Sequence, residues 1–195
     1  MSFPRYKYLL TYRYAEIIYD LTFLFCQKWV SEIKDRRTRD QMEQAARSGK
    51  QNIVEGVGQT ETSKSGEIKL LGVAKASLDE LLADYEDFLR KNNLPIWPKV
   101  DQRVLRFRKI GYDLSSLGNL SGLGNLRHKP ILPIEPVDAA NFLLTLCHME
   151  TYLLDRQILA AKDRLVKEGG VNENLLKKRL EYRKMKLNSP YSSNG

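Results

Sequence analysis

The sequence predicts an all-α protein: an up-and-down four-helix bundle with a long insertion before the last bundle helix and an extra C-terminal basic helix. Apolar residues recur at three- and four-residue spacing through four long segments of the 195-residue chain. A segment rich in glycine and proline separates the third of these from the fourth. We therefore divide the chain into a bundle, 1–168, which contains the basic insertion 99–135, and a C-terminal helix with a disordered tail, 169–195.

The first predicted helix covers 12–34. Its inward stripe consists of four large apolar residues at helical spacing: Ile18, Leu21, Phe25 and Trp29. A stripe of this width is typical of a helix with one face in a core and the other in solvent. The polar and charged residues that follow it, 35–38, interrupt the pattern and predict a break before the next helix.

The second predicted helix, 38–57, has a face of small residues. Thr38 and Gln41 have the spacing of a capping box, which predicts the start of the helix. The inward positions are Ala45, Ala46, Ser48, Gly49, Asn52, Ile53 and Gly56. Small residues allow a neighbouring helix to approach closely. We expect Gly56 and Gly58 to end the helix, and the hydroxyl groups of the link 59–63 to cap the next one.

The third predicted helix, 65–91, has the most continuous apolar stripe. It consists of Leu71, Ala74, Leu78, Leu81, Tyr85 and Phe88. Its second half also carries an acidic run: Asp79, Glu80, Asp84, Glu86 and Asp87. We interpret the acidic run as a solvated helix face, and the alternative is a catalytic or metal-binding cluster. Pro95 and Pro98 prevent the helix from continuing.

The insertion begins with a short predicted helix, 99–110, that is rich in arginine. A Leu-Gly-Asn-Leu motif then occurs twice, at 117–120 and 123–126, and three prolines follow, which predicts a long loop. The fourth bundle helix is predicted over 136–168 and ends at Gly169-Gly170. A last helix, capped by Asn172 or Asn174, is predicted to reach about residue 186.

Charge is the main compositional signal. The chain has 32 Lys and Arg against 24 Asp and Glu, a net charge of +8, and most of the excess lies in 101–195. A positive excess favours polyanionic partners through the release of counterions. The alternative is a moderately basic surface without a specific partner. Tyr and Trp are sparse in the basic stretches, so stacking on bases is not predicted.

Two further features concern the cellular setting. Cys26 and Cys147 lie in apolar stretches without a metal-ligand or redox spacing, so we interpret both as reduced core residues. Such residues suit a reducing cytoplasm. The N-terminal region shows no signal peptide, and no run of about 18 apolar residues predicts a membrane span.

The sequence contains none of the catalytic motifs that helical bundles or nucleotide-binding enzymes commonly carry. His128 and His148 belong to no Glu-x-x-His pair, so a di-iron site of the kind found in helix bundles is not expected. The glycines at 118–124 lack the Gly-Lys-Ser/Thr of a phosphate-binding loop. His148 follows Cys147 directly and points elsewhere on a helix, which argues against a nucleophile–base pair. We therefore expect a protein that is not an enzyme and needs no cofactor or metal.

Motifs in the predicted second and third helices carry a family resemblance. The first motif is Gln41-x-x-x-Ala45-Ala46-x-Ser48-x-x-x-Asn52-Ile53-x-Glu55-Gly56, and the second is Ala74-x-x-Ser77-Leu78-x-Glu80-Leu81. With Tyr19-Asp20-Leu21-Thr22, they resemble the 23S rRNA intervening-sequence four-helix-bundle family, which includes the accessory variability determinants of diversity-generating retroelements. The likeness covers about 14–94. Segments 141–145, 154–157 and 168–170 resemble the variant with a C-terminal suffix domain.

The resemblance implies a homopentameric barrel of four-helix-bundle protomers that binds nucleic acid and a reverse transcriptase. Gln44 stands where the family commonly has arginine, and Gly49 where it commonly has isoleucine. The motif residues that we assign structural roles are Asn52, Glu55, Gly56, Ser77 and Glu80. Asn52 and Glu55 lie three residues apart and are expected to hydrogen-bond across to a neighbouring helix.

Basic residues are the candidates for phosphate contacts, which position a nucleic acid without reading its sequence. They are Arg36, Arg37, Arg39, Arg47, Lys50, Arg103, Arg106, Arg108, Lys109, Lys177, Lys178, Arg179 and Arg183. The leading hypothesis is a non-catalytic, oligomeric protein that binds RNA or an RNA–DNA hybrid. The alternative is a protein-interaction scaffold that binds no nucleic acid. A third hypothesis, an enzyme, depends only on the acidic run.

Overall fold

The computed structural model describes residues 4–116 and 131–187, and all regular structure in these ranges is helical. The elements are the 3-10 helix η1 (Arg5–Tyr8) and the α-helices α1 (Leu10–Trp29), α2 (Arg36–Gln59), α3 (Lys64–Lys91), α4 (Gln102–Ser116), α5 (Pro136–Glu168) and α6 (Val171–Leu187). The predicted all-α class is confirmed. The Leu-Gly-Asn-Leu motifs and the tail, for which a loop and disorder are predicted, lie outside the described residues.

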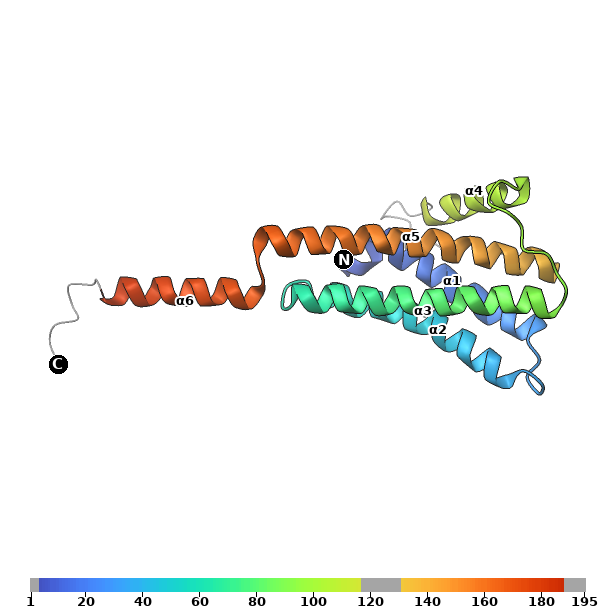
Figure 1. The fold of residues 1–195 in the computed structure, drawn as a ribbon, viewed down its shortest axis with the longest axis horizontal. Coiled ribbons are helices and arrows are strands. Elements are labelled where there is room, and N and C mark those ends of the chain that lie inside the picture. Colours follow the sequence, from blue (N-terminus) through green and yellow to red (C-terminus); the bar gives the residue numbers. More distant parts are fainter. Residues whose placement is uncertain (1–3, 117–130, 188–195) are drawn as a thin grey trace.

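Five helices, α1 to α5, pack together (Figure 1). Helices α1, α2, α3 and α5 make bundle-like contacts, since α2 contacts α1 and α3, and α5 contacts α3 and α1. Consecutive members of this set run in opposite directions along the long axis (Figure 1). Helix α4 lies outside the set and packs on α5 and, more weakly, on α1.

The core lies among these four helices. Ile18, Leu21 and Phe25 of α1 are fully buried, as their periodicity predicts. The Phe25 ring meets Tyr85 and Phe88 of α3 edge to face, with ring centres 5.1 and 4.8 Å away. Edge-to-face pairs stabilise the folded protein beyond the burial of their apolar surface. This aromatic cluster therefore stabilises one end of the α1–α3 contact.

Both ends of α2 differ from the prediction. The helix begins at Arg36, because the Arg39 amide already bonds to the Asp35 carbonyl at 2.9 Å, so Thr38 lies inside the first turn. The capping box prediction is therefore wrong. Gly56 and Gly58 also lie inside the helix, which continues to Gln59. Neither glycine has the positive φ of a helix terminator.

The small face of α2 packs on α3, as predicted. A Cβ atom at Gly49 would lie 3.0 Å from Leu78 Cγ, and one at Gly56 would lie 3.4 Å from Leu70 Cβ. A side chain at Gly49 would therefore force the Leu78 side chain to shift. Beside Gly49, the hydroxyl groups of Ser48 and Ser77 hydrogen-bond across the interface at 2.9 Å.

The other helix ends follow the sequence more closely. Ser63 Oγ accepts a hydrogen bond from the Gly66 amide at 3.0 Å, which confirms a hydroxyl cap at the start of α3. Helix α5 ends at Gly169, whose φ of +70° favours glycine. Neither Asn172 nor Asn174 caps α6, because the helix already begins at Val171. Instead, Glu173 accepts from the Gly170 amide at 3.0 Å.

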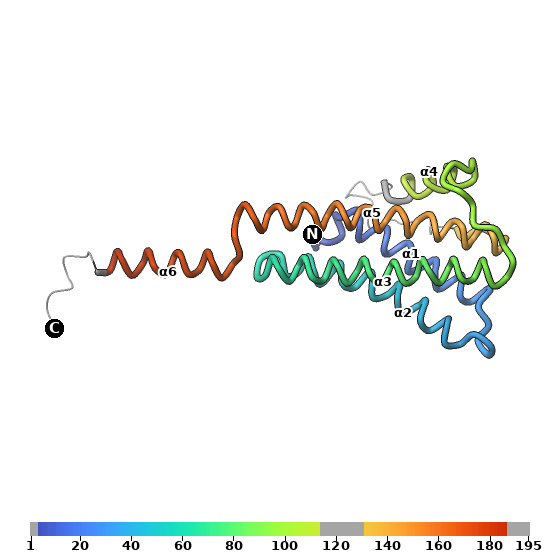
Figure 2. The backbone as a smooth tube through the Cα atoms, viewed as in Figure 1, coloured from blue at the N-terminus to red at the C-terminus, as the bar shows by residue number. Residues whose placement is uncertain are grey.

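Helix α6 extends beyond the end of the bundle and does not pack along it (Figures 1 and 2). The Gly169-Gly170 junction displaces it sideways from the line of α5 (Figure 2). The Asn174 side chain donates to the Glu168 carbonyl at 2.9 Å and joins the two helices across the junction. The exposed part of α6 therefore begins at a turn that hydrogen bonds hold in place.

Candidate nucleic-acid interface

Helix α6 is the most exposed basic element in the described structure. It carries six basic and two acidic residues. The basic residues, all exposed, are Lys177, Lys178, Arg179, Arg183, Lys184 and Lys186. Within the described ranges none of them forms an ion pair. Their charges are therefore available to a polyanion without the loss of an existing partner.

The predicted contacts on α2 are less available. Arg39 Nε lies 3.0 Å from Glu43, and Arg36 Nε lies 3.9 Å from Asp40. The Lys50 ammonium group lies over the Tyr19 ring, 3.9 Å from its centre. Arg37 and Arg47 are exposed, and no ion pair to another described residue is present for either. Of the five predicted cations on this helix, only these two are unengaged.

On α4, one arginine is engaged and three basic residues are not. The Arg103 guanidinium bonds to Asp101 at 2.7 and 3.0 Å and lies 3.7 Å from the centre of the Trp97 ring. Hydrogen bonds from Arg103 lower the pKa of Asp101 to about 2. Arg106, Arg108 and Lys109 form no ion pair with described residues, and Arg106 and Lys109 are exposed.

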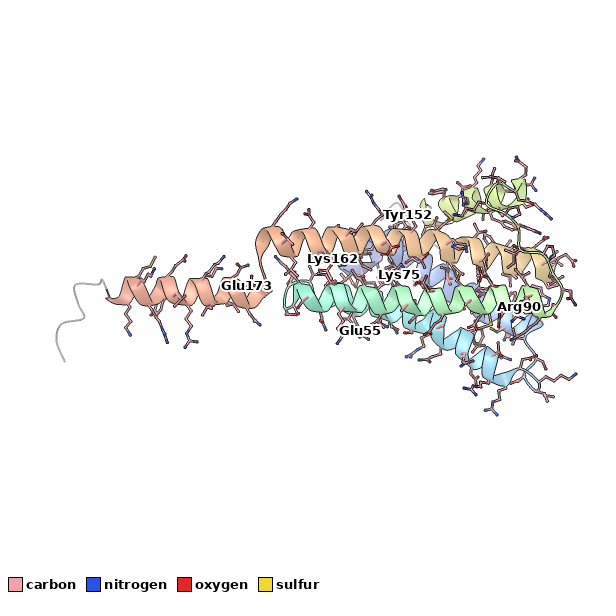
Figure 3. The ribbon with its side chains drawn as sticks, viewed as in Figure 1. Glu55, Lys75, Arg90, Tyr152, Lys162 and Glu173 are labelled. Atoms are coloured by element: carbon pink, nitrogen blue, oxygen red, sulfur yellow. The ribbon has the colours of Figure 1, made fainter. Side chains whose placement is uncertain are left out.

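The structural motif residues lie where α2 and α3 meet, but their hydrogen bonds differ from the prediction. Asn52 donates within its own helix, to the Ser48 carbonyl at 2.9 Å and to its hydroxyl at 3.1 Å. The bond across to α3 is made by Ser48 and Ser77. Glu55 is exposed (Figure 3). The prediction that Asn52 and Glu55 bond to a neighbouring helix is therefore wrong.

A groove of about 950 Å³ lies between the first half of α2 and the second half of α3. The two helices diverge there (Figure 2). Arg36 and Arg37 line the groove from α2, and Glu80 and Asp84 line it from α3. Burial raises the pKa of Asp84, and the nearby Asp87 and Glu80 add to the effect. The groove thus holds both signs of charge, which is less favourable for a phosphate group than a purely basic surface.

A second hollow, a pocket of about 500 Å³, lies between α4, α5 and the segment that precedes α4. Asn141 positions this segment: its side chain accepts from the Trp97 amide at 2.9 Å and donates to the Pro95 carbonyl at 3.0 Å. Trp97 then stacks on Phe107 of α4 with ring centres 5.8 Å apart. Aromatic and basic residues therefore meet at this pocket.

The pocket corrects an expectation from the sequence. Tyr and Trp are sparse in the basic stretches, so no stacking surface is predicted there. The structure brings Trp97, Tyr112 and Tyr152 from three separate segments to the wall of one pocket, beside Lys99 and Arg108. No local spacing signals this meeting, because it depends on how α4 packs against α5.

Models of known protein families, curated proteins and solved structures contain no match to this chain. The family resemblance and the assembly and partners that it implies therefore stay predictions.

The described residues contain no group of three or more His, Cys, Asp or Glu side chains that could hold a metal ion. Much of the acidic run on α3 is paired or exposed. Asp79 lies 3.5 Å from Lys75, and Asp87 lies 2.7 Å from Arg90.

Cys26 and Cys147 are free and buried, as predicted. In the ranges that the structure describes, no helix is long and apolar enough to cross a membrane.

Proposed function

We propose that this protein is a non-catalytic nucleic-acid-binding accessory protein that binds RNA or an RNA–DNA hybrid through phosphate contacts. The observation that carries the proposal is the exposed basic helix α6, whose six cations have no ion-pair partner among the described residues. Each cation that meets a phosphate releases condensed counterions, and this release drives binding. Arg106 and Lys109 of α4 are two further exposed cations without an ion-pair partner among the described residues, and they lie on the bundle, away from α6 (Figure 1).

The arrangement of charge on α6 favours binding without sequence readout. With about 100° between successive residues, Lys177 and Lys184 lie on one side of the helix, and Arg179 and Lys186 lie on the opposite side. Such a helix contacts phosphates in several orientations, whereas readout of base edges requires one fixed face. The expected partner is therefore recognised by charge and shape.

Helix α6 also exposes large apolar side chains, which supports assembly with further protein. They are Leu175, Leu176, Leu180, Tyr182 and Met185. Exposed apolar side chains of this density are typical of interaction surfaces. They support assembly with another protein chain, and the family resemblance supports a pentamer of four-helix bundles and a reverse transcriptase as the protein partner.

Reversing two charges on α6 is the first test. The double variant Lys177→Glu with Lys178→Glu is expected to weaken RNA binding and to flatten its salt dependence. Each lost phosphate contact reduces the slope of log K against log salt by about 0.7–0.9. The matched control is Arg156→Glu with Lys162→Glu, which reverses two exposed charges of α5. Fluorescence anisotropy of a labelled RNA, measured over a series of salt concentrations, gives both slopes.

Equal losses in both double variants would contradict a role for α6 and would indicate a general effect of net charge. Absence of RNA binding by the native protein at low salt would contradict the proposed function itself. The alternative function is a protein scaffold, which predicts partner binding that survives high salt.

The oligomeric state is the second test. Light scattering of the purified protein, before and after nuclease treatment, is expected to give a mass of several 22.5-kDa protomers in both cases. An ultraviolet absorbance ratio shifted towards nucleic acid before treatment supports RNA binding. A monomer under both conditions would contradict the oligomer, and a mass that falls to one protomer after nuclease treatment would show that RNA, not protein, joins the copies.

A further inference from the structure

The pocket between α4 and α5 has the construction of a small-ligand site. Four parts of the chain line it: Glu86 of α3, residues 96–99, α4 and α5. Val104, Leu144 and Met149 supply apolar wall. Its volume of about 500 Å³ lies within the usual range for such sites, which is about 300–1,000 Å³. An apolar hollow with a few polar groups is the usual form of a site that orients a small ligand.

Aromatic rings lie at the open part of this pocket. Tyr112 of α4 exposes 62% of its surface and Tyr152 of α5 exposes 64%. Tyr152 lies on α5 near one end of α4 (Figure 3). Exposed tyrosine rings beside an apolar hollow suit a flat aromatic ligand. When the two rings stack, the contacting face of the tyrosine and that of the ligand are both removed from water.

The polar groups of the pocket indicate a ligand with a negative charge. Lys99 and Arg108 both line the pocket, and neither forms an ion pair with a described residue. Arginine and lysine are the usual partners of phosphate groups. A phosphate attached to a flat ring would meet the two cations while the ring lies against the tyrosines.

The remaining polar groups suit the edge of a heterocycle. Desolvation lowers the pKa of His148; Lys99 and Arg108 lower it further, and Glu86 opposes them. This shift favours the neutral imidazole, which offers one nitrogen donor and one nitrogen acceptor. The Glu86 carboxylate, which also lines the pocket, accepts from ring or amino N–H groups. A plain aromatic anion has no such donors to offer.

We propose that this pocket binds a nucleobase that carries a phosphate group. The base packs against Tyr112 and Tyr152, and its edge meets His148. The phosphate lies at Lys99 and Arg108. The ligand has two sources, a free mononucleotide or an unpaired base of a strand bound along α4, and only the second source rests on the proposed function.

The first experiment is calorimetric titration of the full-length protein with AMP, CMP, GMP and UMP, and with ribose 5-phosphate and phenyl phosphate as ligands without a base. At least one nucleotide is expected to bind with a Kd below about 1 mM and more tightly than either reference ligand. Tyr152→Ala is expected to weaken this binding about tenfold or more, because one stacking contact is lost. The matched control is Tyr8→Ala, which changes an exposed tyrosine of η1 (40% exposed) that does not line the pocket.

The second experiment compares a labelled single-stranded RNA with the same strand made abasic at every position of a short central block. A bound strand that places a base in the pocket binds more tightly with its bases present, and Tyr152→Ala removes the difference. Either result alone, a nucleotide that binds through Tyr152 or a base-dependent strand, supports the pocket and identifies its source.

The proposal is overturned if no nucleotide binds at about 1 mM and the abasic strand binds as tightly as the intact strand. It is also overturned if ribose 5-phosphate or phenyl phosphate binds as tightly as the nucleotides. These outcomes are distinct from failure of the proposed function, which shows as absence of RNA binding by the native protein at low salt. If no nucleotide binds and RNA binding depends on α6 alone, the proposed function stands and the pocket proposal fails.

Discussion

Gly49→Ile is expected to lower the free energy of unfolding by about 1–3 kcal/mol, because it adds a side chain to a filled interface. The new Cβ atom would lie 3.0 Å from Leu78 Cγ and 3.1 Å from Leu78 Cδ2. Leu78 is fully buried, so its side chain cannot move aside into solvent. The higher helix propensity of isoleucine offsets only about 0.5 kcal/mol of the loss. Urea denaturation followed by circular dichroism measures the change.

A compensating variant separates overpacking from other causes. Leu78→Ala alone leaves a cavity and is expected to lower the free energy of unfolding by about 2–5 kcal/mol. In the double variant, the introduced isoleucine side chain occupies the space that Leu78 vacates, so the combined loss is smaller than the sum of the single losses. Losses that simply add would contradict the close contact at Gly49.

An exposed glycine of α3 provides the control. A Cβ atom at Gly72, which faces solvent, would have no neighbour within 4 Å. Gly72→Ala is therefore expected to raise the free energy of unfolding by about 0.5–1 kcal/mol through helix propensity. A gain at Gly72 with a loss at Gly49 shows that close helix approach, and not glycine as such, sets the sign.

Glu150→Met is expected to raise the free energy of unfolding at pH 8 by about 1–3 kcal/mol. Glu150 of α5 is fully buried, and neither carboxyl oxygen has a hydrogen-bond partner among the described residues. Desolvation raises the pKa of Glu150 well above its ordinary value of about 4.5. Methionine has a similar length and suits an apolar site.

The effect depends on pH. In the unfolded chain Glu150 loses its proton near pH 4.5, whereas the folded protein retains it to a higher pH. Stability therefore falls as pH rises above about 4.5, by at most about 1.4 kcal/mol per pH unit from this group. The gain from Glu150→Met is accordingly larger at pH 8 than at pH 5.

Denaturation of both proteins at pH 5 and pH 8 tests this prediction. The control is Glu55→Met, which changes an exposed glutamate of α2 and is expected to shift stability by less than about 0.5 kcal/mol at either pH. A loss of stability in Glu150→Met at pH 8 would contradict the prediction, since it would show that the fold stabilises the carboxyl group.

Sequence patterns predict the helices well where the pattern is long. The apolar stripe of α3 and the start and end of α5 agree with the structure to within a residue or two. The ends of α2 are wrong for a local reason: Thr38, Gly56 and Gly58 have the chemistry of helix ends but occupy interior positions. At Gly56 the residue lies inside α2 where the helix packs on α3, and a Cβ atom there would lie 3.4 Å from Leu70 Cβ.

The candidate interface is only partly predictable. Basic residues are visible in the sequence, but their availability depends on partners: Asp101 engages Arg103, and Glu43 engages Arg39. The pocket between α4 and α5 is invisible in the sequence because its walls come from distant segments. Glu150 is also missed, since a single acidic residue on an apolar helix resembles an ordinary exposed position until the neighbouring helices are in place.

The displaced helix α6 has a hydrodynamic consequence. Its 17 residues extend the molecule by about 25 Å beyond the bundle, although they make up only a small part of its mass. Figure 1 shows the resulting rod-like outline. Translational friction grows with length, so the Stokes radius of one protomer exceeds that of a sphere of 22.5 kDa. The protein therefore elutes early from a sizing column, and removal of residues 171–195 shortens the Stokes radius by more than the lost mass accounts for.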